Sequence, residues 1–281
     1  MEAWLLQQEP VLRLVAFFSI FALIAWWEWK RPRRTMRLTR RQRWPANLGI
    51  VALNTLVVRL LFPVAAVAWA AHVHEQGWGL LNIWGISGLA AVVLGVVVMD
   101  GIIYLQHVMV HAVPMLWRLH QVHHADPAYD VTTGARFHPV EIVLSMGIKF
   151  ITILWLGPPA AAVLLFEVIL NGMAMFNHGN IRLPLAVDRL LRLLLVTPDV
   201  HRVHHSTIPS EANSNFGFNL SIWDRLFGTY KAQPELGHEQ MEIGITTHQG
   251  PNTHSFWGLL TLPMAQKPDR YALNRRWSDP S

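Results

Sequence analysis

The chain has no cysteine and few charged side chains. Of its 281 residues, 15% are charged and 52% are hydrophobic. Without cysteine there is no disulfide framework, thiolate zinc site, iron–sulfur ligand or cysteine nucleophile, so any metal must bind through nitrogen or oxygen. The excess of apolar over charged residues is typical of a membrane-embedded chain.

The net charge of +5 reflects basic residues concentrated between positions 30 and 43. Because this run directly follows an apolar segment, it marks the cytoplasmic flank of a membrane span and does not indicate nucleic-acid binding. The N-terminus carries Glu2 and Glu9 and lacks the basic start of a cleaved signal peptide. We therefore expect the first apolar run to stay as an anchor.

The apolar runs predict an all-α integral membrane helical bundle. Three runs, residues 11–29, 48–73 and 83–103, are each long enough to cross a bilayer. A fourth, residues 140–176, is about twice the length of one span and is interrupted near its middle by Gly-Pro-Pro at 157–159. This pattern predicts a helical hairpin in the membrane, with both ends on one face.

The remaining segments are more polar. Residues 183–196 mix leucine with charged residues, which is typical of a helix lying at the membrane interface. We expect three parts: N-terminal spans with a basic cytoplasmic loop (1–93), a histidine-rich domain with a cytosolic helical cap (94–230), and a polar C-terminal tail (231–281).

Ten of the 15 histidines follow a strict arrangement. Helical offsets of three and four return to one face, so each HxxHH box directs two or three imidazoles at one point. About ten nitrogens are too many for one tetrahedral ion but suit two ions of five or six coordination. The candidate ligands are His107 and His111, the boxes His120, His123, His124 and His201, His204, His205, and the single residues His138 and His178 at the hairpin ends.

The motif of zinc proteases, HExxH, is absent from the chain. Imidazole ligands suit iron, zinc, copper and nickel alike. Iron is favoured because a membrane-buried dinuclear site beside an apolar cavity suits O2 activation against hydrocarbon. The other histidines, which we interpret as solvated or hydrogen-bonded, are His72, His74, His238, His248 and His254.

Asp100 and Tyr104 share the helix face of the first histidine pair, so they are candidates for orienting imidazoles through hydrogen bonds. Alternatively, Asp100 pairs with Arg118 or Arg136, since a charge buried in a membrane costs at least about 2.5 kcal/mol unless it is paired. Further candidates for the orienting role are Asp199 and Glu141.

Several motifs occur in order between residues 100 and 230. They are DGIIYLQHVMVH, LWRLHQVHHADPAYDVTTGARFHPVE, FNHGN, TPDVHRVHHS and NSNFGFNLSIWDRLFGTY. The pattern resembles the fatty acid hydroxylase and sterol desaturase superfamily of membrane di-iron enzymes. The resemblance implies that the ten histidines bind two iron ions, with zinc possible in purified material. Asn177 and Asn215 also match, and we expect them to support the ligands.

The resemblance further implies that O2 and two electrons are used to hydroxylate or desaturate a lipid C–H bond. The sequence does not distinguish between these two reactions. It also leaves the substrate class open among acyl chains, sterols, alkyl glycerols, carotenoids and aminolipids. A Gly-rich dinucleotide fingerprint and a fused cytochrome b5 segment are both absent. We therefore expect a separate electron donor, which is a reductase, a ferredoxin or a cytochrome b5-like protein.

Two other functions compete with a lipid oxygenase. A metal transporter needs ligands near the bilayer midplane, whereas these boxes lie at span ends and in polar segments. A catalytically inactive lipid-binding protein with a structural metal stays open. The lack of an ER retrieval ending and the short chain favour a bacterial inner membrane, with the metal site facing the cytoplasm.

Overall fold

The computed structural model describes residues 2–265 and residue 273, and within them every regular element is a helix. This confirms the predicted all-α class. The long elements are α1 (Glu2–Lys30), α2 (Arg40–Leu61), α3 (Ala66–Glu75), α5 (Gly88–Ala112), α6 (Pro114–His124), α7 (Pro139–Leu156) and α8 (Ala160–Asn177). The short ones are α4 (Leu80–Ile83), η1 (Thr133–Ala135), α9 (Leu185–Leu191), α10 (Pro198–His204), α11 (Pro209–Ala212), α12 (Ile222–Leu226), α13 (Gly237–Gln240), η2 (Pro251–His254), α14 (Phe256–Thr261) and η3 (Leu262–Met264).

Five helical segments in the described part of the chain are long and apolar enough to cross a membrane. A bilayer core of about 30 Å needs about 20 helical residues, and tilt or local thinning accommodates slightly shorter helices. The protein is therefore an integral membrane protein. The five segments are Gln7–Lys30, Arg40–Ile83, Gly88–Ala112, Pro139–Leu156 and Ala160–Asn177.

The predicted hairpin is confirmed and consists of α7 and α8. Gly157 ends α7 with φ 68°, a left-handed conformation that glycine adopts without steric cost, and Pro159 precedes the first residue of α8. A side chain on Gly79 would overlap the backbone of Gly157, so this turn packs closely against the segment before α4. Lys149 of α7 donates a hydrogen bond to Glu167 of α8, which links the two arms, and His178 directly follows the last residue of α8.

Two predicted spans differ from the observed helices. Residues 48–73 were expected to form one helix, but α2 ends at Leu61 and α3 begins at Ala66. The break contains Pro63, which lacks an N–H and disfavours helical conformation at Phe62 before it. The third run starts later than expected and extends to Ala112, so the first histidine pair lies in the last turns of α5.

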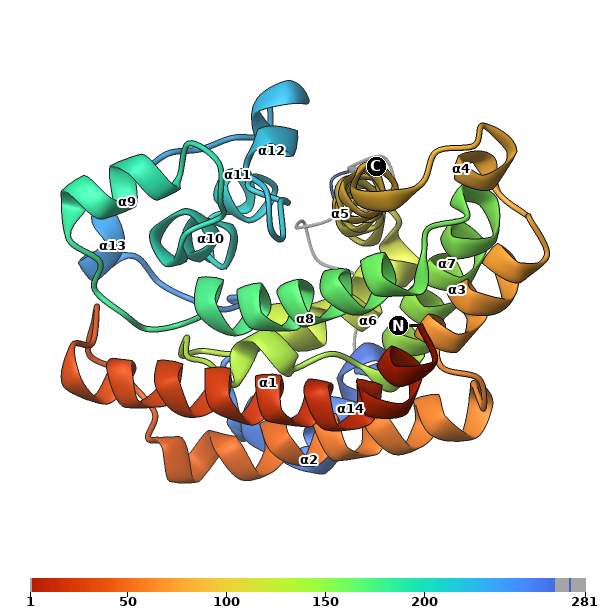
Figure 1. Cartoon of the computed structure of the whole chain (residues 1–281). Helices are drawn as coiled ribbons and strands as arrows, with labels where there is room; N and C mark the ends of the chain where they lie inside the picture. Colours follow the sequence, from red (N-terminus) through yellow and green to blue (C-terminus); the bar gives the residue numbers. More distant parts are fainter. Residues whose placement is uncertain (1, 266–272, 274–281) are drawn as a thin grey trace, which may run out of the picture.

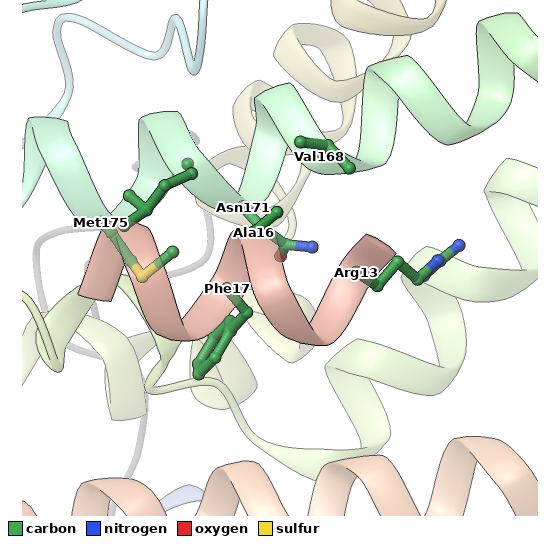
Figure 2. Close-up of a pocket in the computed structure, with 8 residues that line it drawn as sticks. Arg13, Ala16, Phe17, Val168, Asn171 and Met175 are labelled. Atoms are coloured by element: carbon green, nitrogen blue, oxygen red, sulfur yellow. The ribbon is translucent and has the colours of Figure 1, made fainter. Parts of the chain in front are cut away.

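The bundle is built around α8, which lies beside α1 (Figure 1). Between these two helices the Arg13 guanidinium forms an ion pair with Glu167, which also accepts a hydrogen bond from Lys149 of α7. A small, partly open pocket lies here, lined by residues that include Arg13, Phe17, Asn171 and Met175 (Figure 2). No histidine lines it, so it is separate from the histidine residues described below.

The smaller helices cover the end of the molecule at which α1 and α8 finish. Figure 1 shows α9, α10 and α13 gathered there, whereas α12 lies farther along the side, nearer α5. The predicted interfacial helix within residues 183–196 corresponds to α9. Part of the expected tail is folded, because α14 packs on α2 and η3 packs on α6.

Candidate metal centre

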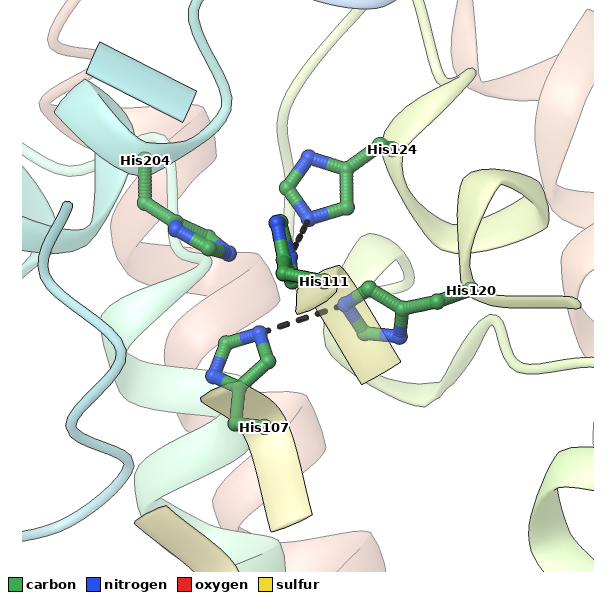
Figure 3. A group of neighbouring side chains, drawn as sticks. All are labelled: His107, His111, His120, His124 and His204. Atoms are coloured by element: carbon green, nitrogen blue, oxygen red, sulfur yellow. Dashed lines mark hydrogen bonds between the residues drawn. The ribbon is translucent and has the colours of Figure 1, made fainter. Parts of the chain in front are cut away.

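Nine of the ten predicted ligand histidines come together in two buried groups. Within each group the potential ligand nitrogens lie within 4.8 Å of one another. Figure 3 shows the five rings of the first group converging on one point. The first histidine group consists of His107, His111, His120, His124 and His204, and the second consists of His123, His178, His201 and His205.

Helix spacing explains how three short stretches supply most of these rings. The offset of four places both histidines of α5 on one face, and α6 and α10 each contribute a box from their last turn. His178 immediately follows α8, so the hairpin brings it back to the same end of the bundle. Separate elements therefore enclose a common centre.

The two groups share a boundary. The ring centroids of His124 and His205 lie 4.5 Å apart, and those of His204 and His201 lie 5.1 Å apart. Five nitrogens on one side and four on the other suit two neighbouring ions better than one, because a single ion rarely takes more than six such ligands.

The outer nitrogens of several rings are held by acceptors. Nδ1 of His107 donates to the Phe216 carbonyl at 2.8 Å, and Nδ1 of His204 donates to the Ser214 carbonyl at 2.7 Å. In the second group, Nδ1 of His178 donates to the Ala174 carbonyl at 2.7 Å. A carbonyl oxygen only accepts, so each of these rings carries its proton on Nδ1 and leaves a lone pair on Nε2.

The inner nitrogens consequently need a cation. His120 donates Nδ1–H to the Glu141 carboxylate at 2.7 Å, so its Nε2 also carries a lone pair. Yet Nε2 of His107 and Nε2 of His120 face each other at 3.2 Å. Two lone pairs at this distance repel each other, and Nε2 of His204 is buried without a hydrogen-bond partner. A metal ion that accepts these lone pairs removes the repulsion between His107 and His120 and gives Nε2 of His204 a partner. The donor set therefore fits a metal.

The protonation state of the rings also suits metal binding. Burial lowers the pKa of His178 and of His204 to about 3, and it lowers the pKa of His123 and His205 well below the usual 6.5. These imidazoles are therefore neutral at pH 7, which is the form that binds a metal.

Two of the proposed supporting residues contact the histidine shell or its acceptors. Glu141 holds His120 directly. Asn215, with φ 51°, donates to the carbonyls of Val200 and Lys231 and so fixes the turn between Ser214 and Phe216. The carbonyls of Ser214 and Phe216 are the acceptors for His204 and His107, so Asn215 supports the ligands indirectly.

The other proposed supporting residues bond elsewhere. Asp100 accepts hydrogen bonds from Trp223 Nε1 and the Leu220 backbone, and pairs with neither of the arginines considered from the sequence. Tyr104 hydrogen-bonds Thr229 at 2.9 Å. Asn177 donates to the Phe218 carbonyl at 2.9 Å, and Asp199 pairs with Arg33 and Arg202. Burial alone would raise the pKa of Asp199, but these arginines and His238 lower it below its usual value.

His138 lies outside both histidine groups. It is the N-cap of α7, where its Nδ1 accepts a hydrogen bond from the Val140 backbone at 3.2 Å, and its Nε2 lies 3.4 Å from the Leu260 carbonyl. With both nitrogens engaged in this way, His138 points to neither group. Its role as a ligand stays a prediction without a place in the observed geometry.

The loop after the first box is fixed by a buried ion network that the sequence did not reveal. Arg43 of α2 donates to Asp126 at 2.8 Å and to Asp130 at 2.7 Å. Arg136 donates to the Val122 carbonyl at 2.8 Å. Although burial raises the pKa of Asp126, Arg43 and Arg136 together lower it to about 2, so the carboxylate stays charged.

Backbone packing fixes the second histidine group as well. A Cβ on Gly134 would overlap the Ala174 carbonyl, the acceptor for His178, and would lie 3.1 Å from Nδ1 of the ring itself. Phe137 stacks on the ring of His123 at 4.4 Å. Sequence reasoning missed these contacts, although the HPVE stretch after Phe137 did point to Glu141.

Comparison with known proteins agrees with this geometry. The family model described as fatty acid hydroxylase matches residues 92–229, which contain all ten candidate ligands. The chain belongs to the fatty acid hydroxylase superfamily. The hydroxylase domain therefore begins in α5 and includes both histidine groups.

Three relatives are lipid-modifying enzymes by name. The chain is 30% identical over 185 residues to the ornithine lipid hydroxylase of Rhizobium tropici, which covers 66% of this chain and 54% of that protein. It is 31% identical over 148 residues to human alkylglycerol monooxygenase, and the match covers 51% of this chain and 30% of that protein. It is 26% identical over 174 residues to alkylglycerol monooxygenase of Caenorhabditis elegans, and the match covers 57% of this chain and 32% of that protein. The chain thus spans about half or less of these relatives, and no solved structure matches it significantly.

Proposed function

We propose that this protein is a membrane oxygenase that hydroxylates a C–H bond of a lipid with O2 and two external electrons. Two iron ions, one in each histidine group, are the proposed cofactor. The observation that carries this proposal is the lone-pair contact between Nε2 of His107 and Nε2 of His120, 3.2 Å apart and both turned inward. The names of the relatives favour hydroxylation over desaturation.

When bound, two iron ions would supply O2 activation: one oxygen atom would enter the substrate C–H bond and the other would leave as water after uptake of two electrons and two protons. The chain's own residues bind and orient. Glu141 and the carbonyls of Ser214 and Phe216 keep the imidazole lone pairs turned inward, which raises ligand basicity and fixes ring orientation.

The apolar surroundings suit a hydrocarbon substrate. A small, partly open pocket lies between α5, α7 and α8, and Ile103 in its wall is one helical turn before His107. Met99 and Phe166 add apolar side chains to this wall, which suits contact with a hydrocarbon, although the pocket itself holds no more than a water-sized group.

We further propose that the metal centre faces the cytoplasm of a bacterial inner membrane and receives electrons from a separate protein. Support comes from the basic loop after α1, which lies beside the second histidine group: the Arg33 backbone donates to the Asn180 carbonyl at 3.0 Å, two residues after His178. Positive loops of this kind are usually cytoplasmic.

Lipid mass spectrometry of expressing cells, compared with cells expressing a His204→Ala variant, tests the proposal. We expect a lipid that gains one oxygen only with the unmodified protein, and two iron ions per chain in purified material. A product lacking two hydrogens would instead identify a desaturase.

The matched control is His72→Ala, an exposed histidine outside both groups. It should keep both the product and the metal. Unchanged lipids with full metal occupancy would favour a lipid-binding protein with a structural metal, and metal flux into proteoliposomes would favour a transporter.

A further inference from the structure

An exposed apolar surface lies outside the five candidate membrane spans. It is formed by α9, α12 and the residues beside them. Two of its leucines, Leu190 and Leu226, are 69% and 67% exposed. Apolar patches of this kind mark sites of contact with a membrane or another protein. We call this surface the shelf, and it consists of Leu185, Val187, Leu190, Leu193, Leu194, Ile222, Leu226 and Phe227.

The two halves of the shelf are one structural unit. The Ser221 backbone N–H donates to the Leu194 carbonyl at 2.9 Å, next to an antiparallel bridge between Leu195 and Leu220. Arg225 of α12 donates to the Arg192 carbonyl at 3.0 Å, immediately after α9. The apolar side chains of α9 and α12 therefore keep a fixed relation to each other.

The shelf is attached to the middle of a membrane-spanning helix. Trp223 Nε1 donates to Asp100 at 2.8 Å, and Phe227 stacks on Tyr104 with ring centroids 5.3 Å apart. Asp100 lies 12 residues from either end of α5, or about 18 Å at 1.5 Å per residue. Figure 1 places α12 toward α5 accordingly. The α12 half of the shelf thus runs alongside a span.

The shelf also leads directly to the metal centre. The chain segment just before it contains Phe216, whose carbonyl accepts the hydrogen bond from His107, and Phe218, whose ring centroid is 5.7 Å from that of His107. Asp100 is seven residues before His107 on α5, about 10 Å along the helix. The chain segment that leads into the shelf therefore also forms one wall of the first histidine group.

We propose that the shelf is immersed in the bilayer leaflet on the histidine side, and that the lipid substrate passes over it from the bilayer to the histidine groups. The continuity with α5 argues for lipid as the occupant. Arg189, exposed among the leucines of α9, fits an interfacial depth, because a long arginine side chain reaches the headgroup layer while its helix lies in the apolar boundary. The passage rests on the proposed function, whereas the immersion does not.

Because the chain has no cysteine, single cysteines can report the depth of the shelf. Leu190→Cys and Leu226→Cys are labelled with a nitroxide in vesicles of phosphatidylethanolamine and phosphatidylglycerol. Power saturation then compares collisions with O2, which concentrates in the bilayer, and with a water-soluble nickel chelate. The references are Leu23→Cys, on the exposed apolar side of α1, and Gln233→Cys, on the exposed polar segment before α13.

We expect the depth parameters of both shelf positions to shift to the lipid side, toward the value at Leu23. Values equal to that of Gln233 would overturn the immersion. Low accessibility to both reagents together with spin–spin broadening would also overturn it, because a second copy of the chain would then cover the shelf.

The passage is tested separately with Leu190→Glu combined with Leu226→Glu. We expect slower turnover of the bilayer lipid identified by mass spectrometry, with unchanged metal content and unchanged spectra of the metal centre. Turnover equal to that of the unmodified protein would overturn the passage. If the unmodified protein turns over no lipid, the proposed function fails, while the nitroxide measurement still decides the immersion.

Discussion

Glu141 holds His120 by accepting its Nδ1–H at 2.7 Å, with both side chains almost fully buried. This contact turns the Nε2 lone pair of His120 toward His107. Carboxylates that bind the outer nitrogen of a ligand histidine fix its tautomer and raise its basicity. The pair therefore connects the start of the membrane hairpin to the metal centre.

Replacing this carboxylate should weaken metal binding without removing a ligand. For Glu141→Ala we expect a loss of about 10- to 100-fold in metal affinity, measured by competition with a chelator. Glu141→Gln keeps an acceptor oxygen and should therefore lose less metal affinity than Glu141→Ala. Glu239→Ala, at an exposed carboxylate, is the control and should bind metal normally. Equal affinities for Glu141→Ala and the control would exclude this role for Glu141.

His138 and His123 should respond differently to the same substitution. His123→Ala should lose metal from the second histidine group. His138→Ala should retain both ions and lose about 1 kcal/mol of stability, because only a helix N-cap is removed. Elemental analysis and thermal unfolding measure the two effects, and His138→Asn should restore the stability. Loss of an ion from His138→Ala would instead establish it as a ligand.

The buried arginine of α2 should be essential for the loop after the first box. Arg43→Met leaves Asp126 and Asp130 without their main partner in a site that excludes water. We expect a loss of about 3–5 kcal/mol, the usual effect of breaking a buried ion pair, observed as a lower unfolding temperature in detergent. Arg41→Met, at an exposed position of the same helix, should change stability little. A small effect at Arg43 would mean that Arg136 compensates.

The metal-free protein should become less stable as the pH falls below about 6.5. In the folded state the pKa values of His178 and His204 are about 3, so the unfolded chain binds protons that the folded chain does not. Between the unfolded pKa of about 6.5 and the folded pKa of about 3, each of these histidines should lower the free energy of unfolding by about 1 kcal/mol per pH unit. Thermal unfolding of chelator-treated protein between pH 7 and pH 5 measures the slope, with the exposed His72→Gln variant as the control. A flat profile would contradict the burial of neutral imidazoles.

The sequence predicted those parts of the fold that depend on local patterning. The Gly-Pro-Pro interruption located the hairpin turn, and offsets of three and four located the boxes, because both signals act within a few residues. Pro63 was an equally local signal that the apolar average over residues 48–73 concealed. Hydropathy measures length and composition, whereas a single proline decides whether the helix continues.

Side-chain partners were harder to predict. Asp100 lies on the same helix face as His107, yet it bonds Trp223 from a segment more than 100 residues later. Periodicity gives the direction of a side chain on its own helix but not which distant segment packs there. The N-cap role of His138 has the same origin, since a histidine before a Pro-Val-Glu turn looks identical in sequence whether it binds a metal or a backbone N–H.

Gly134 shows that an intact set of histidines does not guarantee an intact metal centre. Adding one methyl group at this position forces the end of α8 away from η1 and displaces the anchor of His178, although every ligand is still encoded. A survey that judged related chains by their histidines alone would score such a variant as active. Residue 134 therefore belongs in any criterion used to separate working members of the superfamily from silent ones.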